Sequence, residues 1–141
     1  MRPSLLYRVA AVLLVLFTVG HTVGFRQVDP QWGIDATIAG MKGTSFQILG
    51  TQRTYWDFFV GFGFTISVLQ LLAALVAWQF ATLDPPALAR MALVRWGLAV
   101  AFAALSILSW CYLFPVPVIF SLAITLCLGL AAWSGNRGAV A

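Results

Sequence analysis

Charge is scarce in this sequence, and glutamate is absent from it. Only 9% of the 141 residues are charged and 62% are hydrophobic, whereas soluble domains carry about 25% charged residues. A chain of this length has more apolar surface than its own interior can bury. The composition therefore argues against a soluble globular domain and favours lipid as the surrounding solvent. The length suits one domain.

Cysteine and histidine are also rare, which limits metal and cofactor chemistry. The two cysteines, Cys111 and Cys127, lie within apolar stretches and match neither a metal motif such as CxxC nor a disulfide framework. The one histidine, His21, supplies an axial ligand to only one side of a haem, so a bis-histidine haem would need a symmetric dimer. We therefore expect no metal and no cofactor.

Long apolar runs are what the sequence does contain. A bilayer core of about 30 Å is crossed by about 20 helical residues. Asp84-Pro85-Pro86 ends one run, because proline lacks the N–H and restricts its predecessor, and Pro115-Val116-Pro117 is predicted to form a tight turn. The tail from Ser134 is expected to fray. The four predicted spanning helices cover residues 5–25, 55–83, 90–114 and 116–133.

The first run, residues 5–25, also has the basic start and apolar middle of a signal peptide. No clear A-x-A cleavage site follows it, so we favour a retained helix. The fold class is therefore predicted to be all-α: a membrane-embedded four-helix bundle that forms a single transmembrane domain over residues 1–141.

The connection between the first two spans, residues 26–54, is polar and long. Ile34, Ile38 and Met41 recur within it at helical spacing. A loop of this length without structure of its own would be unusual. We therefore predict a short interfacial helix that lies on the membrane or caps the bundle.

The net charge is +4, but the basic residues are scattered along the chain and form no cluster that would bind nucleic acid. Their positions are better explained as signals of membrane topology. Cations accumulate on the cytoplasmic side of membrane proteins. The N-terminus, the second loop and the tail hold five cations, and the 26–54 loop holds three. This predicts a multi-pass protein of the cytoplasmic (inner) membrane with both termini inside and the 26–54 loop extracytoplasmic. The five are Arg2, Arg8, Arg90, Arg95 and Arg137, and the three are Arg26, Lys42 and Arg53.

Small and polar residues form a stripe on each predicted span. Membrane helices associate through such residues, because lipid tails are as apolar as leucine. In the second span, Gly63, Ser67 and Gln70 share a face. An unpaired amide at mid-membrane is costly, so Gln70 is expected to form an interhelical hydrogen bond or to contact a ligand.

His21 and Asp57 are expected at the same height, because the first helix ends near one and the second begins near the other. Ionisable groups at membrane depth are energetically costly, and those that are present usually serve a function. Three interpretations remain open. Asp57 can sit in the favourable field of its helix N-terminus and pair with Arg53, Arg26 or His21. The arginines can instead bind a lipid headgroup, with Gly61 and Gly63 leaving room. Third, His21 and Asp57 can form an acid–base dyad.

Two motifs carry a family resemblance. Residues 50–67, with RTYWDFFVGFG at their centre, and the HTVG segment at residues 21–24 resemble an uncharacterised family of small bacterial four-helix membrane proteins. The resemblance implies that fold and a bacterial inner-membrane location, but no activity. Length and helix count are also similar to DoxX-like proteins and to the emopamil-binding sterol isomerase group. The sterol isomerase group relies on acidic residues within its spans, and this chain has no glutamate. No catalytic residue is therefore carried over from either group.

The sequence therefore predicts a non-enzymatic membrane protein that binds a lipid-like or small hydrophobic ligand, or a partner membrane protein, at an outer-leaflet site. Membrane lipid is the expected partner. The alternative is a membrane enzyme that acts on a lipid-soluble substrate through the His/Asp dyad. None of the aspartates lies deep in a span, which argues against proton-coupled export. The candidate ligand-binding residues are His21, Arg26, Arg53, Trp56, Asp57, Gly61 and Gln70.

Overall fold

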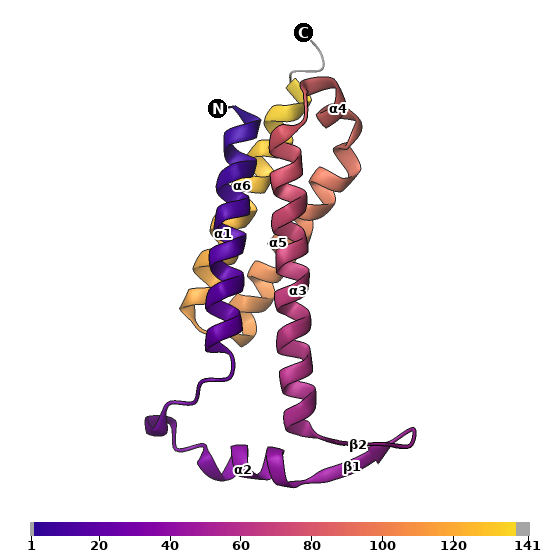
Figure 1. The fold of residues 1–141 in the computed structure, drawn as a ribbon. Helices are drawn as coiled ribbons and strands as arrows, with labels where there is room; N and C mark the ends of the chain where they lie inside the picture. The colour runs from indigo at the N-terminus through magenta and orange to yellow at the C-terminus, as the bar shows by residue number, and fades with distance from the viewer. Residues whose placement is uncertain (1, 138–141) are drawn as a thin grey trace. The chain divides into compact units, whose positions relative to one another are not determined.

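The computed structural model describes residues 2–137 of the chain, and its secondary structure is dominated by helices (Figure 1). Two short strands occur in the connection between the first two long helices. The elements in chain order are α1 (Pro3–Gly24), the 3-10 helix η1 (Pro30–Trp32), α2 (Asp35–Gly43), β1 (Ser45–Ile48), β2 (Thr51–Thr54), α3 (Tyr55–Thr82), α4 (Pro85–Arg90), α5 (Ala92–Tyr112) and α6 (Pro115–Arg137).

Four of these helices, α1, α3, α5 and α6, are long and apolar enough to cross a membrane. Large apolar side chains remain exposed on each of them, for example Leu16, Leu75, Ile107 and Leu126. Lipid tails are the solvent that suits such a surface. The predicted all-α fold of a multi-pass membrane protein is confirmed.

Two helix boundaries differ from the predictions for a local reason. Pro115 is the first residue of α6, so the predicted tight turn is the first turn of the helix. Proline suits that position because its missing N–H would have had no intrahelical acceptor there.

Asp84 caps α4 by accepting a hydrogen bond from the Ala87 N–H at 2.8 Å, and Arg90 therefore belongs to α4 and not to the next span. The tail is helical to Arg137, and residues 138–141 lie outside the described part.

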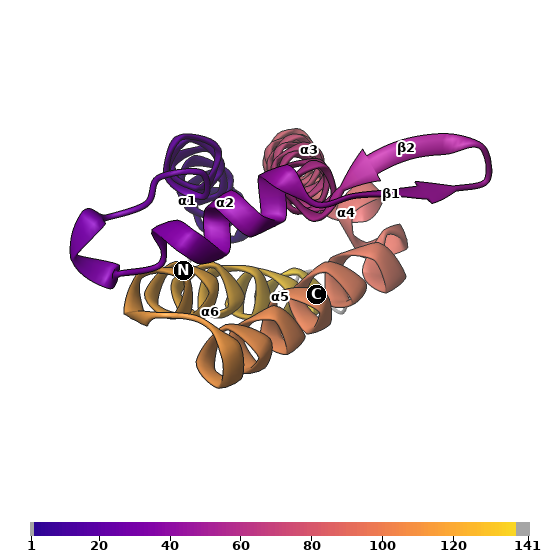
Figure 2. The same cartoon turned by 90° about the horizontal axis from the view of Figure 1, so that it is seen from below.

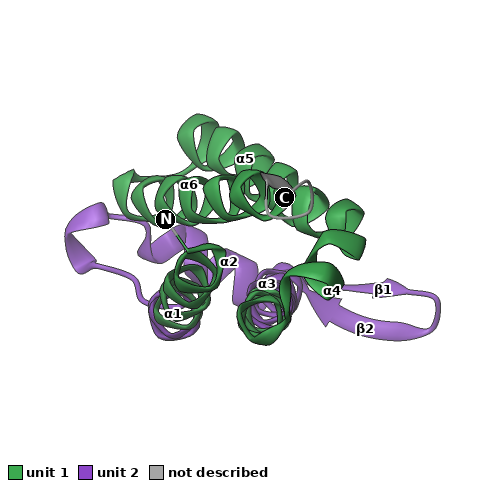
Figure 3. Cartoon of the chain, turned by 90° about the horizontal axis from the view of Figure 1, so that it is seen from above, with its two compact units in different colours: residues 1–18, 70–141 green, residues 19–69 purple. Residues whose placement is uncertain are grey.

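The chain divides into two compact units (Figure 3). Unit 1 comprises residues 1–18 and 70–141, and unit 2 comprises residues 19–69. Helices α1 and α3 each contribute to both units. The prediction of a single domain stays a prediction.

In unit 1 the closest helix pair is α5 and α6, which run side by side (Figure 2). Ser106 of α5 and Thr125 of α6 share a hydrogen bond of 3.2 Å between their hydroxyl oxygens. Hydrogen bonds between small polar residues are typical of membrane helix interfaces. The core of this unit also holds Leu14 of α1 and Ile124 and Leu128 of α6, all fully buried.

A cationic side chain, Arg95, is also fully buried in unit 1. The sequence suggested only a topology signal at the entry to the third span. Arg95 donates through Nη1 to the Ala132 carbonyl at 3.3 Å, and the guanidinium lies where a Cβ on Gly135 would be. It also lies beside the Tyr7 hydroxyl, and the Tyr7 ring contacts Phe80 with centroids 5.3 Å apart. Arg95 therefore joins α5 to the last turns of α6.

In unit 2 the connection between α1 and α3 is structured along most of its length. The predicted short helix is present as α2, and its half-buried positions are Ile38 and Met41 together with the N-cap residue Ile34. Strands β1 and β2 then form an antiparallel hairpin that the sequence did not predict, with Ser45 opposite Thr54 and Ile48 opposite Thr51.

The hairpin turns at Leu49 and Gly50, which both have positive φ, 48° and 81°. This pair of angles is typical of a tight hairpin turn, for which leucine is an uncommon residue. At the other end of the hairpin, Phe46 contacts the rings of Tyr55 and Phe58 at the start of α3, with centroids 5.0 and 5.8 Å apart. These contacts anchor the hairpin to α3.

Candidate functional site

Helices α1 and α3 are joined in unit 2 by two side chains near the end of α1. The His21 Nε2 atom lies 3.0 Å from the Gly63 carbonyl oxygen. A carbonyl only accepts, so Nε2 carries the hydrogen and His21 donates. Thr22 donates to the Ser67 hydroxyl at 2.8 Å, and Ser67 donates in turn to the Gly63 carbonyl at 3.3 Å. The predicted polar faces of these two helices therefore meet in unit 2.

The Phe25 ring closes over the same glycine. It stacks on the His21 ring with centroids 5.2 Å apart, and a Cβ built on Gly63 would fall within the ring. The space that Gly63 leaves is therefore filled by Phe25, and the expectation that it accommodates a headgroup is wrong. Gly61, by contrast, has no atom within 4 Å of a built Cβ, so the space beside it is open.

Asp57 lies in the first turn of α3, as predicted, but its partner is Thr54. The Thr54 N–H and hydroxyl donate to the Asp57 carboxylate at 2.8 and 3.0 Å, and the Asp57 N–H donates back to the Thr54 hydroxyl at 3.1 Å. This is a reciprocal capping arrangement. The hydrogen bonds of Asp57 therefore go to its own helix start, whereas His21 binds Gly63, which lies six residues beyond Asp57 in α3. At about 1.5 Å per residue that is about 9 Å along the helix axis, so the two residues are not at the same height, and among the described residues no hydrogen bond joins the predicted acid–base pair.

Each of the four carboxylates in the chain stands at a helix start. Asp29 caps η1 through the Gln31 N–H at 2.9 Å, Asp35 begins α2, and Asp84 caps α4. Anions are stabilised at helix N-termini by the unsatisfied N–H groups and the helix dipole. Among the described residues, no carboxylate forms an ion pair with the arginines of the 26–54 connection.

The cations of this connection are held in other ways. The exposed Arg26 guanidinium lies over two rings, 5.5 Å from the Phe25 centroid and 5.0 Å from that of Phe64. Lys42 lies over Trp56, with Nζ 4.6 Å from the ring centroid. Arg53 donates to the Gln52 carbonyl at 2.7 Å. The structure thus places His21 and Arg26 against the same ring, that of Phe25.

Gln70, the remaining predicted site residue, belongs to unit 1. It is buried, with 8% of its surface exposed. Its Oε1 atom accepts no hydrogen bond from the described residues. The interhelical hydrogen bond predicted for this amide is therefore not made by its oxygen.

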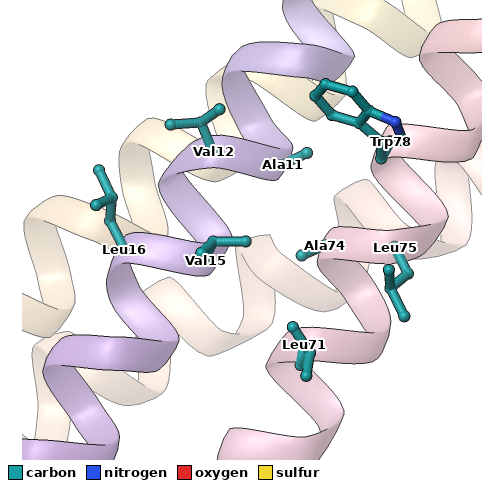
Figure 4. A pocket seen from close by; sticks show the side chains of 8 residues that line it. All are labelled: Ala11, Val12, Val15, Leu16, Leu71, Ala74, Leu75 and Trp78. Atoms are coloured by element: carbon teal, nitrogen blue, oxygen red, sulfur yellow. The ribbon is translucent and has the colours of Figure 1, made fainter.

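A feature that the sequence did not reveal is a groove between α1 and α3 in unit 1 (Figure 4). It has a volume of about 400 Å³ and is partly open to its surroundings. Ala11 and Ala74, which are almost fully buried, form its floor, and larger exposed side chains form its walls. The wall residues are Val12, Val15, Leu16, Leu71, Leu75 and Trp78.

Within the part of the chain that the structure describes, no three His, Cys, Asp or Glu side chains come together as a metal site would need. Comparisons with protein-family models, curated proteins and solved structures gave no match to this chain. The family resemblance therefore stays a prediction, and the function must be argued from the geometry.

Proposed function

We propose that this membrane protein binds a lipid-like hydrophobic ligand in the groove between α1 and α3 of unit 1. The observation that supports the proposal is the lining of the groove, where all eight residues are apolar. Its volume of about 400 Å³ falls in the range of small-molecule sites, about 300–1,000 Å³.

Hydrocarbon suits this groove better than water does. A water molecule in a cavity needs two to four polar partners, and the lining offers only the indole N–H of Trp78. An empty groove would forfeit dispersion contacts on both helices. Because the surrounding lipid is equally apolar, binding depends on shape and dispersion, and the groove favours a chain or ring that fits between its walls.

The alanine floor explains why the groove exists. Ala11 and Ala74 face the space between the helices from opposite sides, and Val15 and Trp78 project into it from α1 and α3 (Figure 4). Alanine side chains are too short to meet across that space. A larger residue at either position would occupy part of the volume that the ligand needs.

Native mass spectrometry of the protein released from mild detergent tests the proposal. The wild-type protein should retain a co-purified lipid-like molecule. Ala74→Leu and Val15→Phe should reduce the retained fraction, because both fill the groove. Val15 lies on the exposed wall, so its variant is the less disturbing of the two.

Ala101→Leu is the matched control, because it adds the same atoms to an exposed position of α5 outside the groove. It should retain the ligand as the wild type does. Retention that is unchanged in both groove variants, or bare protein in several mild detergents, would refute groove binding. A retained mass equal to a second chain would assign the groove to a partner membrane protein.

We further propose that both termini lie on the cytoplasmic side of a bacterial inner membrane. Without the buried Arg95, four cations near the chain ends and in the α3–α5 connection still outnumber the three of the 26–54 connection, which supports this orientation. The four are Arg2, Arg8, Arg90 and Arg137. A C-terminal fusion to green fluorescent protein should fluoresce, since the fluorophore matures in the cytoplasm. A dark C-terminal fusion with a fluorescent 26–54 insertion would reverse the topology.

A further inference from the structure

Four aromatic rings form a continuous strip in unit 2 at the start of α3 and the end of α1. The Trp56 and Phe59 centroids are 5.3 Å apart, those of Phe59 and Phe25 are 5.9 Å apart, and those of Phe25 and Phe64 are 5.4 Å apart. Trp56, Phe59, Phe25 and Phe64 are called the aromatic strip below.

Each end of the aromatic strip holds one cation against a ring face. Lys42 lies over Trp56 at 4.6 Å, and Arg26 lies over Phe25 and Phe64 at 5.5 and 5.0 Å. Cation–π attraction restrains both side chains. Much of the conformational freedom that these long side chains would lose on binding a ligand is therefore already restricted.

Neither cation has an anionic partner among the described residues. The carboxylates of Asp29, Asp57 and Asp84 accept hydrogen bonds from backbone N–H groups at helix starts. Arg26 donates no hydrogen bond within the described chain, so its guanidinium donors are available to a ligand. Arg53 differs, because its guanidinium donates to the Gln52 carbonyl at 2.7 Å.

We infer that Arg26 and Lys42, held at the two ends of the aromatic strip, each bind the phosphate diester of an anionic phospholipid. Arg26 follows the end of α1 at Gly24, and Trp56 is the second residue of α3. Phospholipid phosphates lie where spanning helices leave the hydrocarbon. Guanidinium binds phosphate through paired N–H donors, and ammonium binds it as a point charge.

The two cations also select among headgroups. Phosphatidylglycerol presents a phosphate with no compensating cation, whereas phosphatidylcholine brings a quaternary ammonium group near a like charge at either end of the strip. The site therefore prefers the anionic lipid. This preference rests on unit 2 alone and is independent of the groove in unit 1, so either site can fail its test while the other stands.

The experiment compares retained lipids by native mass spectrometry after the protein is placed in nanodiscs of equal parts dioleoyl phosphatidylglycerol and dioleoyl phosphatidylcholine. The wild type should retain phosphatidylglycerol preferentially. The Arg26→Gln/Lys42→Gln variant should lose that preference by about fivefold for each cation removed, the value expected for one basic residue near an anionic surface. Circular dichroism of each variant checks that it has folded.

The charge-matched control is Arg8→Gln/Arg90→Gln, which removes two exposed arginines outside unit 2. It should keep the preference. An equal loss in the control would show that net charge alone attracts the lipid, and an unchanged preference in the double variant of unit 2 would also overturn the inference.

Glycerol 3-phosphate, added in large excess to the wild type in detergent, distinguishes a lipid from a soluble phosphate ester. The lipid assignment predicts that bound phosphatidylglycerol stays in place. Full displacement by glycerol 3-phosphate would refute a lipid source and point to a soluble phosphate ester as the ligand.

Discussion

The contact between Phe25 and Gly63 offers a sharp test of how α1 and α3 are joined. A methyl group added by Gly63→Ala would overlap the Phe25 ring. The ring cannot move alone, because it also contacts His21, Phe59 and Phe64. The substitution should therefore disturb the whole cluster.

The expected magnitude follows from two opposing effects. Replacing a glycine inside a helix by alanine stabilises it by about 0.5–1 kcal/mol. Inserting atoms into a filled site costs about 1–3 kcal/mol. Gly61 supplies the matched control, because nothing lies within 4 Å of its built Cβ. Gly61→Ala should show the gain alone, and Gly63→Ala should be less stable than Gly61→Ala by about 1–3 kcal/mol.

The assay is reversible unfolding in mixed micelles of dodecyl maltoside and increasing sodium dodecyl sulfate, followed by far-UV circular dichroism. A Phe25→Ala background completes a double-mutant cycle. Without the ring, Gly63→Ala should recover the gain seen for Gly61→Ala. If Gly63→Ala in the wild-type background is as stabilising as Gly61→Ala, Phe25 does not occupy this space and the account of the cluster is wrong.

Three further outcomes are expected in the same unfolding assay. Thr54→Ala should lower stability by about 1 kcal/mol because it removes a helix cap, and Thr54→Ser should keep most of the stability; equal loss in both would contradict the cap. Ser106→Ala should cost about 0.6 kcal/mol, the average for a hydrogen bond between membrane helices, and a loss indistinguishable from zero would remove that bond from the account. Gly135→Ala should destabilise by about 1–3 kcal/mol because its methyl group meets Arg95. Gly129→Ala should not destabilise the protein, because no atom lies within 4 Å of the added methyl group. Equal losses of stability at the two glycines would argue against a tightly packed Arg95 guanidinium.

The spanning helices could be predicted because their signal is local. Apolar runs of the required length, with proline at the boundaries, are sufficient to identify them. The error at Pro115 arose because proline marks both turns and first helical residues, and periodicity does not distinguish the two.

The hairpin could not be predicted, because its strands are short and mostly exposed. Strand β1 alternates polar and apolar residues over only four positions, and β2 is polar throughout. Its turn, Leu49-Gly50, also lacks the Asn-Gly or Asp-Gly signature. The anchoring of Phe46 against Tyr55 and Phe58 depends on tertiary packing, which a single sequence does not show.

The candidate site could be predicted only in part, for similar reasons. The helix-start position of Asp57 follows from sequence. The Thr-x-x-Asp spacing of Thr54 and Asp57 is also a capping signal, although the charges alone favoured an arginine or histidine as the partner of Asp57. The partner of His21 is a backbone carbonyl, that of Gly63, which no residue pattern reveals. The groove in unit 1 depends on the separation of two helices, which the positions of alanines alone do not determine.

The closeness of α5 and α6 implies an order of assembly. The two helices are adjacent in the chain, separated only by Leu113 and Phe114, and contacts between neighbouring segments form fastest because little chain entropy opposes them. The pair needs nothing from α1 or α3 to make its Ser106–Thr125 hydrogen bond. A chain that lacks residues 1–84 should therefore still pack α5 against α6. Cysteine crosslinking between these two helices would reveal whether the C-terminal half is the nucleus on which the remaining helices assemble.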